Sequence, residues 1–465
     1  GTLGGIFGAV VAMLGLITPS IIIILLIAGV MEFVFITMES LFCYIGYYLV
    51  EDYIIVPCLL FVGIAMTRKL TPFAKKRMLL AVAAVAWFVI VQIIHKLSGM
   101  GTHPISTVLF VYLMAFPFAS VTEDRESRGL NLISWIFIAA GMVQVLYAAL
   151  LVLDCVPAMM KEFVYWDGAR LHVFWHPNIT ACFLMIGIGF ACSLIFRTEK
   201  KTMKFVLAGI ILLQFVAMAL TNCRTTLLMT SAFFGSIGFF LIFKGEWKRF
   251  VIGLAVAVAV MAGCFWISGK IYKQHNDALV AQIAAQLEEG KGQDEIETDF
   301  FVHEGTGYIE IVSNNGQYSL SHDMKTLNGR TNIWKASLRA VRDNNLLKLW
   351  GTEYVDVTIS AYFNGSLAHT HNSWMEALLR LGVPGLLLAL VFTCVSVCSA
   401  WVLIWSAGAE IWKKILAVLT MCVMVAGFLE PYLFITNVYY HVIDFIFFFC
   451  TGYLDYWRRQ LTGTK

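Results

Sequence analysis

The chain contains 465 residues, of which 59% are hydrophobic and 14% are charged, and its formal net charge at pH 7 is +3. Because an ordinary soluble domain has about 25% charged residues, this composition excludes a soluble globular protein. The small net charge gives no indication of a nucleic-acid partner. Apolar stretches of membrane-spanning length recur from one end of the chain to the other, so we expect an all-α polytopic membrane protein.

The first 67 residues are predicted to cross the membrane two or three times. Almost no charge interrupts them, and only Pro19 and the pair Glu51-Asp52 indicate breaks. Residue 1 is Gly rather than Met, and we expect no cleavable signal peptide, because its charged region and small-residue cleavage site are not found. Further apolar stretches bring the expected total to about 12 or 13 spans. They lie at 78–96, 105–121, 129–153, 172–196, 205–221, 225–243, 250–267, 375–405, 415–432 and 438–457.

A polar segment interrupts these spans and divides the chain into three parts. We expect a transmembrane bundle at 1–267, a loop domain at 268–370 and a second group of transmembrane helices at 371–465. The Lys and Arg of short loops stay mainly on the cytoplasmic side of a membrane. Here they cluster in alternate connections, so the loop domain is predicted to be extracytoplasmic. The basic connections contain Arg68 to Arg77, Arg125 and Arg128, Arg197 to Lys204, Lys244 to Arg249, Lys413 and Lys414, and Arg458 to Lys465.

Three patterns predict the structure of the loop domain. The acidic, Gly-interrupted stretch from Glu288 to Asp299 indicates a solvated or mobile segment. Residues 308–312 alternate between polar and apolar side chains and are followed by Asn314-Asn315-Gly316, which predicts a β-hairpin. From Thr331 onwards, apolar residues recur at helical spacing, which predicts an amphipathic helix lying over the membrane domain. These apolar residues are Ile333, Trp334, Leu338, Val341 and Leu346.

His371 stands where the polar segment re-enters an apolar span. An imidazole can accept a proton near neutral pH, which makes this residue a candidate general base. The structural alternative is that His371, with Asn372 and Ser373, caps the helix that begins near Trp374. His369 raises the question of a metal site, but two histidines without a well-spaced third ligand do not define one.

Two arginines on the predicted external side are candidate anion binders. Arg224 lies in a minimal connection between two spans, where an arginine within a span would cost about 2.5–3.5 kcal/mol and therefore usually has a partner or a water-filled cavity. Alternatively, it reaches up to the lipid headgroups. Arg330 begins the amphipathic helix, and its guanidinium suits a pyrophosphate. Alternatively, it is a solvated charge or pairs with the acidic stretch.

Further polar residues lie at the same predicted level. His176 and Asn178 flank a proline at the start of a span, and Arg170 precedes them. Glu430 comes at the end of another span, directly before a proline. Each of these residues is a candidate for substrate binding or has a structural role.

The run that starts at His371 resembles the signature of the O-antigen ligase family. That signature is His, then Asn, Ser or Gln, nine residues, Gly, two residues, and Gly, Thr or Tyr. Here it is matched by His371-Asn372, Gly382 and Gly385.

Two other elements resemble those of the same family, in the same order. Arg330, preceded by a glycine and followed by Trp334, is similar to the Gly-Arg…Trp element of the family's large external loop. Arg224 is similar to the Ser-Arg element of a short external turn, although Cys223 replaces the serine. The resemblance extends from about residue 170 to 440.

The resemblance implies a membrane glycosyltransferase with a GT-C-like helical fold in the bacterial inner membrane. The family moves oligosaccharides from undecaprenyl diphosphate to a glycan or glycolipid acceptor outside that membrane, without a nucleotide sugar, a cofactor or a divalent metal. For such a reaction we expect His371 to take the proton of the acceptor hydroxyl as the base of a single, inverting displacement. Arg224 and Arg330 are expected to bind the diphosphate and stabilise the negative charge that develops on it. The other residues expected to contact substrate are Trp334, Asn372, His176, Asn178, Arg170 and Glu430.

The acceptor distinguishes two activities. A ligase must accept a phosphorylated lipid A core, which favours a basic external surface, whereas the segment 268–370 is net acidic. This favours a polymerase, whose acceptor is another lipid-linked repeat. A transporter or flippase of lipid-linked sugars is an alternative of another class, but it predicts internal pseudo-symmetry and charged residues near the membrane midplane. A membrane scaffold would leave the arrangement of arginines and histidine unexplained.

Overall fold

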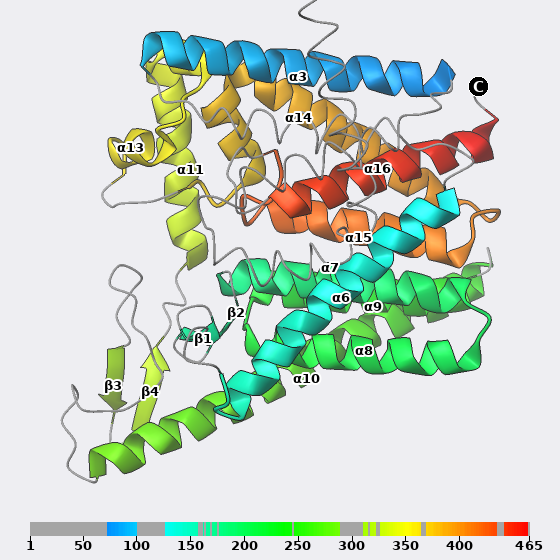
Figure 1. Ribbon diagram of the computed structural model, residues 1–465, viewed down its shortest axis with the longest axis vertical. Coiled ribbons are helices and arrows are strands. Elements are labelled where there is room, and N and C mark those ends of the chain that lie inside the picture. Colours follow the sequence, from blue (N-terminus) through cyan, green and yellow to red (C-terminus); the bar gives the residue numbers. More distant parts are fainter. Residues whose placement is uncertain are drawn as a thin grey trace, which may run out of the picture.

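The computed structural model describes most of the chain from residue 72 onwards, and this part is mainly helical (Figure 1). The expected spans before residue 72 and at 105–121, and the acidic stretch from Glu289 onwards, lie outside the described residues. The described residues are 72–99, 126–156, 161, 164–167, 170–173, 176–243, 246–288, 310–314, 317–321, 326–363, 369–434 and 441–463.

Among the described residues, seven helices are long and apolar enough to cross a membrane, which confirms a polytopic membrane protein. The expected total of 12 or 13 spans stays a prediction. The last part of α10 extends well beyond the expected end of its span at 267, so the predicted domain boundary falls within a helix. The seven are α3 (Pro72–Ser98), α6 (Glu126–Val152), α7 (Pro177–Arg197), α8 (Lys201–Leu220), α9 (Arg224–Ile242), α10 (Trp247–Glu288) and α14 (Ser373–Trp405).

Two further helices complete this part of the protein, α15 (Ile411–Gly427) and α16 (His441–Thr462). The expected end of a span at 432 was wrong, because Pro431 disfavours helical geometry at Glu430 and the chain has already left the helix. The expected start of a span at 172 was also wrong. Residues Arg170–Val173 form strand β2, which pairs antiparallel with β1 (Val164–Asp167), and α7 begins only at Pro177.

Helix α7 is the buried centre of this part of the bundle. It contacts α6, α8, α9 and α15, and an apolar helix enclosed on most sides is buried along its whole length. Polar and small residues allow the close packing. The Nε2 of Gln214 on α8 donates a hydrogen bond to the carbonyl oxygen of Ile138 on α6 at 3.1 Å. Gly187 of α7 leaves room for the Gln214 side chain, and Gly189 leaves room for Leu419.

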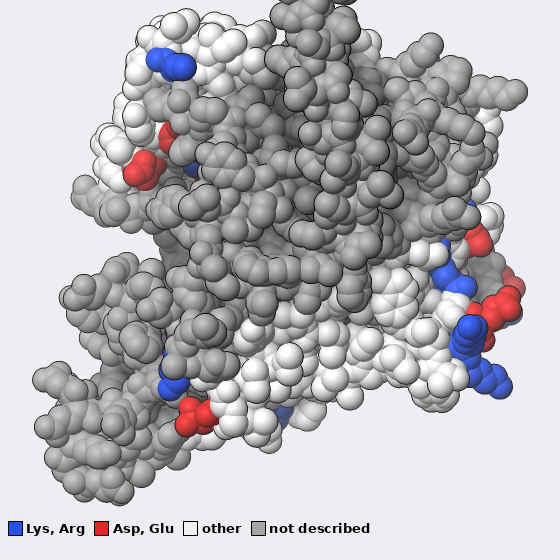
Figure 2. All heavy atoms as spheres, viewed as in Figure 1, with Lys and Arg blue, Asp and Glu red and all other residues white. Residues whose placement is uncertain are grey.

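The antiparallel order of the helices gathers basic residues at one end of the bundle. There the Arg197 guanidinium lies 4.8 Å from the centre of the Trp412 ring, and the ammonium of Lys413 lies 5.6 Å from that of Trp457. On the face drawn in Figure 2, the described Lys and Arg side chains gather chiefly at the right-hand end. The opposite end holds the first residues of α7, α9 and α14 and the last residues of α8 and α15 (Figure 1).

Helix α14 is broken near the end that lies opposite the basic residues. Gly382 has a φ of 69° and interrupts the helix, and the chain at Gly351, with a φ of 74°, passes directly beside it. The break frees carbonyl groups that must find other donors inside a membrane protein. The N–H of Thr352 bonds to the oxygen of Leu379 at 2.7 Å, and the Trp87 indole of α3 bonds to that of Leu381 at 3.0 Å.

The predicted β-hairpin and amphipathic helix of the loop domain are both present. Strands β3 (Glu310–Asn314) and β4 (Gln317–Ser321) pair antiparallel with a two-residue connection. Helix α11 (Thr326–Asp343) contacts α14 and the two short helices α12 (Asn345–Trp350) and α13 (Val355–Ser360).

The buried face of α11 differs from the expected one. Ile333 and Val341 are buried as predicted, but Leu338 is 49% exposed and Leu346, which lies in α12, is 57% exposed. Small residues, Ala336 and Ala340, complete the buried face instead. Spacings of three and four residues place these positions on one side of a helix, and Leu338 falls on the other side.

Candidate functional site

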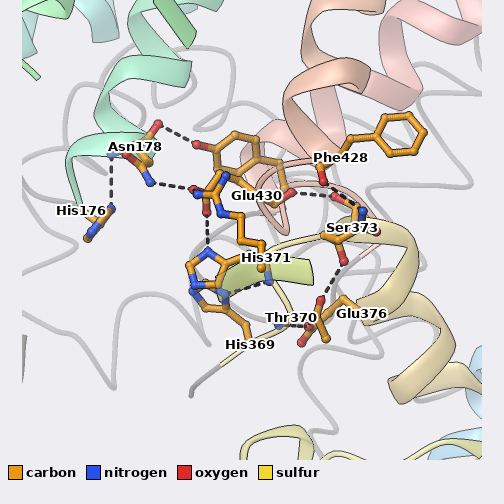
Figure 3. Close-up of polar contacts among 12 residues, drawn as sticks. His176, Asn178, His369, Thr370, His371, Ser373, Glu376, Phe428 and Glu430 are labelled. Carbon is orange, nitrogen blue, oxygen red and sulfur yellow. Dashed lines mark hydrogen bonds and ion pairs between the residues drawn. The ribbon is translucent and has the colours of Figure 1, made fainter. Parts of the chain in front are cut away.

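Four segments that are distant in the sequence meet at the end of the bundle opposite the basic residues (Figure 1), and Figure 3 shows the polar contacts there. They are the start of α7 together with β2, the start of α11, the segment 369–373 that leads into α14, and the segment 428–434 that follows α15. Glu430 lies at the centre, just beyond the end of α15, and its side chain is only 6% exposed.

The carboxylate of Glu430 contacts three residues that the sequence analysis selected. Its Oε1 accepts hydrogen bonds from Nη2 of Arg330 at 2.7 Å and from Nδ2 of Asn178 at 2.8 Å. Its Oε2 lies 3.3 Å from Nδ1 of His371. The predicted base and one predicted diphosphate binder therefore share one carboxylate.

Glu430 is ionised at neutral pH. Burial alone would raise the pKa of its carboxyl, but the hydrogen bond with His371 and the electrostatic interactions with His371, Arg330 and His369 outweigh burial and lower the pKa to about 2. A carboxylate in this state only accepts hydrogen bonds, which matches the donors that surround it.

Arg170 links Glu430 to the turn between α8 and α9. Its Nη2 donates to Oδ1 of Asn178 at 2.6 Å, and its Nε donates to the carbonyl oxygen of Thr221 at 3.0 Å. Asn178 is held further by Tyr432, whose hydroxyl donates to the Asn178 carbonyl oxygen at 2.8 Å. The His176 ring caps α7, because its Nδ1 accepts from the N–H of Asn178 at 3.3 Å.

Arg224 is the first residue of α9 and is exposed. The bond between Arg170 and Thr221 ties the turn before Arg224 to Asn178 and so to the Glu430 cluster. The two predicted diphosphate binders thus lie at the same end of the protein. Arg330 and His371 both contact Glu430. Arg224 is connected to Glu430 only through the turn that precedes it, by way of Arg170 and Asn178.

Asn372 and Trp334 hold the segment that carries His371. Oδ1 of Asn372 accepts from the N–H groups of Trp374 and Met375, both at 2.9 Å, and so it is Asn372 that caps α14. Its Nδ2 donates to the carbonyl oxygen of Phe428 at 2.9 Å. The Trp334 indole donates to the carbonyl oxygen of Thr370 at 3.0 Å.

His371 and His369 lie against each other. Their ring centres are 4.2 Å apart, and Nδ1 of His369 accepts from the backbone N–H of His371 at 3.4 Å. Burial, assisted by the neighbouring His371, lowers the pKa of His369 to about 4, so this ring is neutral at pH 7. Within the described ranges, no group of three or more His, Cys, Asp and Glu residues is arranged to hold a metal ion.

A second buried cluster near His371 was not selected from the sequence. Arg380 contacts Glu376 and Glu353, and Glu376 in turn contacts Thr370, the residue before His371. One signal was available, because Glu376 and Arg380 are oppositely charged residues four positions apart in an apolar span. Glu353 and Thr370 gave no such signal.

Comparison with known proteins identifies one family. The family model described as O-antigen ligase matches residues 209–390, a stretch that contains Arg224, Arg330 and His371. No curated protein matches the chain. The stretch 209–390 is therefore similar to the O-antigen ligase family model, and it contains the three motifs that resemble that family.

Proposed function

We propose that this protein transfers an oligosaccharide from undecaprenyl diphosphate to an acceptor hydroxyl at the extracytoplasmic face of the bacterial inner membrane. The observation that carries this proposal is the meeting of Arg330 and His371 at Glu430, where both Arg330 and His371 lie in the stretch that matches the O-antigen ligase family model. An anion binder and a candidate base side by side are what glycosyl transfer from a diphosphate requires.

His371 acts as the general base in this proposal. The ionised Glu430 faces Nδ1, so the neutral ring carries its proton on Nδ1 and leaves the lone pair of Nε2 free. The His371 side chain is 28% exposed and is therefore accessible to an acceptor. General bases of this kind typically contribute about 10²–10⁴-fold to a rate.

The transfer is a single displacement. Nε2 of His371 takes the proton of the acceptor hydroxyl, and the acceptor oxygen forms a bond to the anomeric carbon of the donor. The bond between that carbon and the diphosphate oxygen breaks, and the electron pair leaves with undecaprenyl diphosphate. Because attack and departure occur on opposite sides of the carbon, the configuration is inverted.

Arginines stabilise the departing diphosphate. The contact with Glu430 uses one of the five N–H donors of Arg330, and the others are suited to phosphate oxygens. Arg224 approaches the same end from the turn before α9, with Arg170 behind it. Guanidinium groups at the place where negative charge develops lower the barrier most when water is excluded, and they supply positive charge without a divalent metal.

The sidedness follows from the basic residues. The end of the bundle that contains Arg197, Lys413 and Arg458 is assigned to the cytoplasm, because short basic loops remain there. The Glu430 cluster lies at the other end, where a lipid-linked donor would be met in the outer leaflet.

For the acceptor, we favour another lipid-linked repeat, which makes the protein a polymerase, because the segment 268–370 is net acidic. Ligation of glycan to lipid A-core is the second candidate, favoured by the description of the matching family. Purified protein is incubated with a defined lipid-linked repeat, with and without lipid A-core, and the products are analysed by mass. Elongated lipid-linked chains indicate the polymerase, and glycan on lipid A-core indicates the ligase.

The base assignment is tested by His371→Asn. His371 has a φ of 52°, which Asn tolerates better than most residues, so this variant removes the imidazole without adding backbone strain. We expect transfer to fall by at least about 100-fold while binding of the lipid-linked donor is retained. The control is His172→Asn, which replaces a ring that stacks on Tyr165 at 4.2 Å. An active His371→Asn protein would refute the assignment.

A further inference from the structure

A buried chain of charged and polar side chains leads to the residue before His371. Nε of Arg380 donates to Oε1 of Glu376 at 2.9 Å, and Nη1 of Arg380 donates to Glu353. The amide of Gln92 on α3 donates to the other oxygen of Glu353. All four residues are at most 7% exposed, and the transfer step proposed above uses none of them.

The chain of contacts ends at the residue before His371. Oε2 of Glu376 accepts a hydrogen bond from the backbone N–H of Thr370 at 3.0 Å and lies 2.9 Å from the Thr370 hydroxyl. That hydroxyl has one proton, for which the carbonyl oxygen of Asn372 at 2.8 Å is the other acceptor. The Thr370 carbonyl oxygen is occupied by the Trp334 indole. Thr370 is completely buried, so its position is determined by these contacts.

His371 needs such support because its backbone is in the left-handed region, with a φ of 52°. Residues other than glycine adopt this region rarely, although His does so more often than most. A conformation of this kind persists only where the surrounding structure determines it fully. After His371, Asn372 caps α14 and binds Phe428; before it, Thr370 is bound to Glu376.

We propose that Glu376, oriented by Arg380 and Glu353, is a positioning residue for the reaction, which fixes Thr370 and thereby holds the His371 imidazole against Glu430. The inference rests on the proposed role of His371 as the base. By this inference, Thr370 and the triad of Glu376, Arg380 and Glu353 also affect the rate of transfer. A buried ion cluster that merely stabilises the fold is the alternative.

The test is made at Thr370, because removing an acidic residue leaves the buried Arg380 with one carboxylate partner fewer and endangers folding. Thr370→Val removes the hydroxyl at nearly the same volume, and Thr370→Ser is the matched control that keeps it. Rates are measured on the purified full chain with a defined lipid-linked oligosaccharide as donor.

We expect Thr370→Val to lower kcat by about 10- to 100-fold, as a small displacement of a reacting group does. The KM for the donor and the melting temperature should remain close to those of the parent. Thr370→Ser, which keeps the hydroxyl, should have the kcat of the parent. Combining Thr370→Val with Glu376→Gln should lower kcat no further than the stronger single variant, because both act through one path.

Three results overturn the inference. The first is an unchanged kcat in Thr370→Val, and the second is an equal loss of kcat in Thr370→Val and Thr370→Ser. The third is a double variant in which the losses of kcat of Thr370→Val and Glu376→Gln multiply fully. Failure of the proposed function is recognised separately. If His371→Asn remains active, His371 is not the base. If His371→Asn is inactive while Thr370→Val retains full kcat, only the positioning role fails.

Discussion

Replacing Glu430 by Gln tests the central carboxylate with almost no change of shape. In the parent, Oε1 receives two donors, from Arg330 and Asn178, and Oε2 faces Nδ1 of His371. The oxygen of the new amide must occupy the Oε1 position, because an amide nitrogen there would face two donors. The NH₂ group therefore points at His371.

This orientation reverses the tautomer of His371, the proposed base. Because Nδ1 of His371 then faces a donor, it becomes an acceptor, and the ring proton moves to Nε2. The lone pair of Nε2 is then no longer available to take the proton of the acceptor hydroxyl. We expect kcat to fall by about 10²–10⁴-fold, the usual contribution of a general base. The ion pair with Arg330 is lost as well. The fall of the Glu430 pKa from 4.5 to about 2 corresponds to about 3 kcal/mol in favour of the charged form, so some loss of thermal stability should accompany the loss of rate.

The assay follows initial rates and product masses with purified protein and a defined lipid-linked oligosaccharide. Donor binding and melting temperature are measured on the same samples, so that a misfolded protein is recognised. Glu410→Gln is the matched control, because that carboxylate pairs with Lys413 at the basic end and is 59% exposed. A folded Glu430→Gln protein with the kcat of the parent would refute both the tautomer argument and the role of Glu430.

Two further predictions concern stability. Because burial lowers the pKa of His369 from 6.5 to about 4, the folded state binds fewer protons than the unfolded state, and stability should be lost as the pH falls from about 6.5 to 4; melting temperatures between pH 7.5 and 4 measure this, and His369→Gln should flatten the profile. Gly382→Ala would place a Cβ against the carbonyl of Leu349 at a φ of 69°, so it should destabilise the protein by at least about 1–2 kcal/mol, seen as a lower melting temperature. Gly263→Ala, whose Cβ meets nothing within 4 Å, should be neutral or stabilising; equal losses in both variants would contradict the packing argument.

The sequence predicted which residues gather at one end of the bundle but not which of them touch. Apolar periodicity and the two prolines placed Asn178 and Glu430 near span ends at one level, and the family motifs selected Arg330 and His371. That Glu430 receives all three others depends on where α11 and the chain after α15 meet, which local pattern does not encode. The sequence analysis predicts that Glu430 binds substrate; within the protein its side chain contacts His371, Arg330 and Asn178.

Burial in α11 shows why local pattern is insufficient in another way. Its apolar pattern includes Leu338, yet Leu338 is exposed, while Ala336 and Ala340 are buried. Helix α11 packs against α12, α13 and α14, and the positions that become buried depend on these neighbouring helices rather than on the size of the apolar side chains. Similarly, the start of α7 at Pro177 reflects the preceding β1–β2 hairpin, whose four-residue strands are too short for a clear alternating pattern.

The indole of Trp87 completes the hydrogen bonding of a helix that lies almost three hundred positions further along the chain. Without α3, the carbonyl of Leu381 would stand unbonded where no water replaces the lost donor, at a cost of several kcal/mol. A shortened protein built around residues 209–390 alone would lack this donor, as well as Asn178 and Glu430. Attempts to produce a minimal enzyme for biochemistry should therefore begin upstream of α3 and continue past α15.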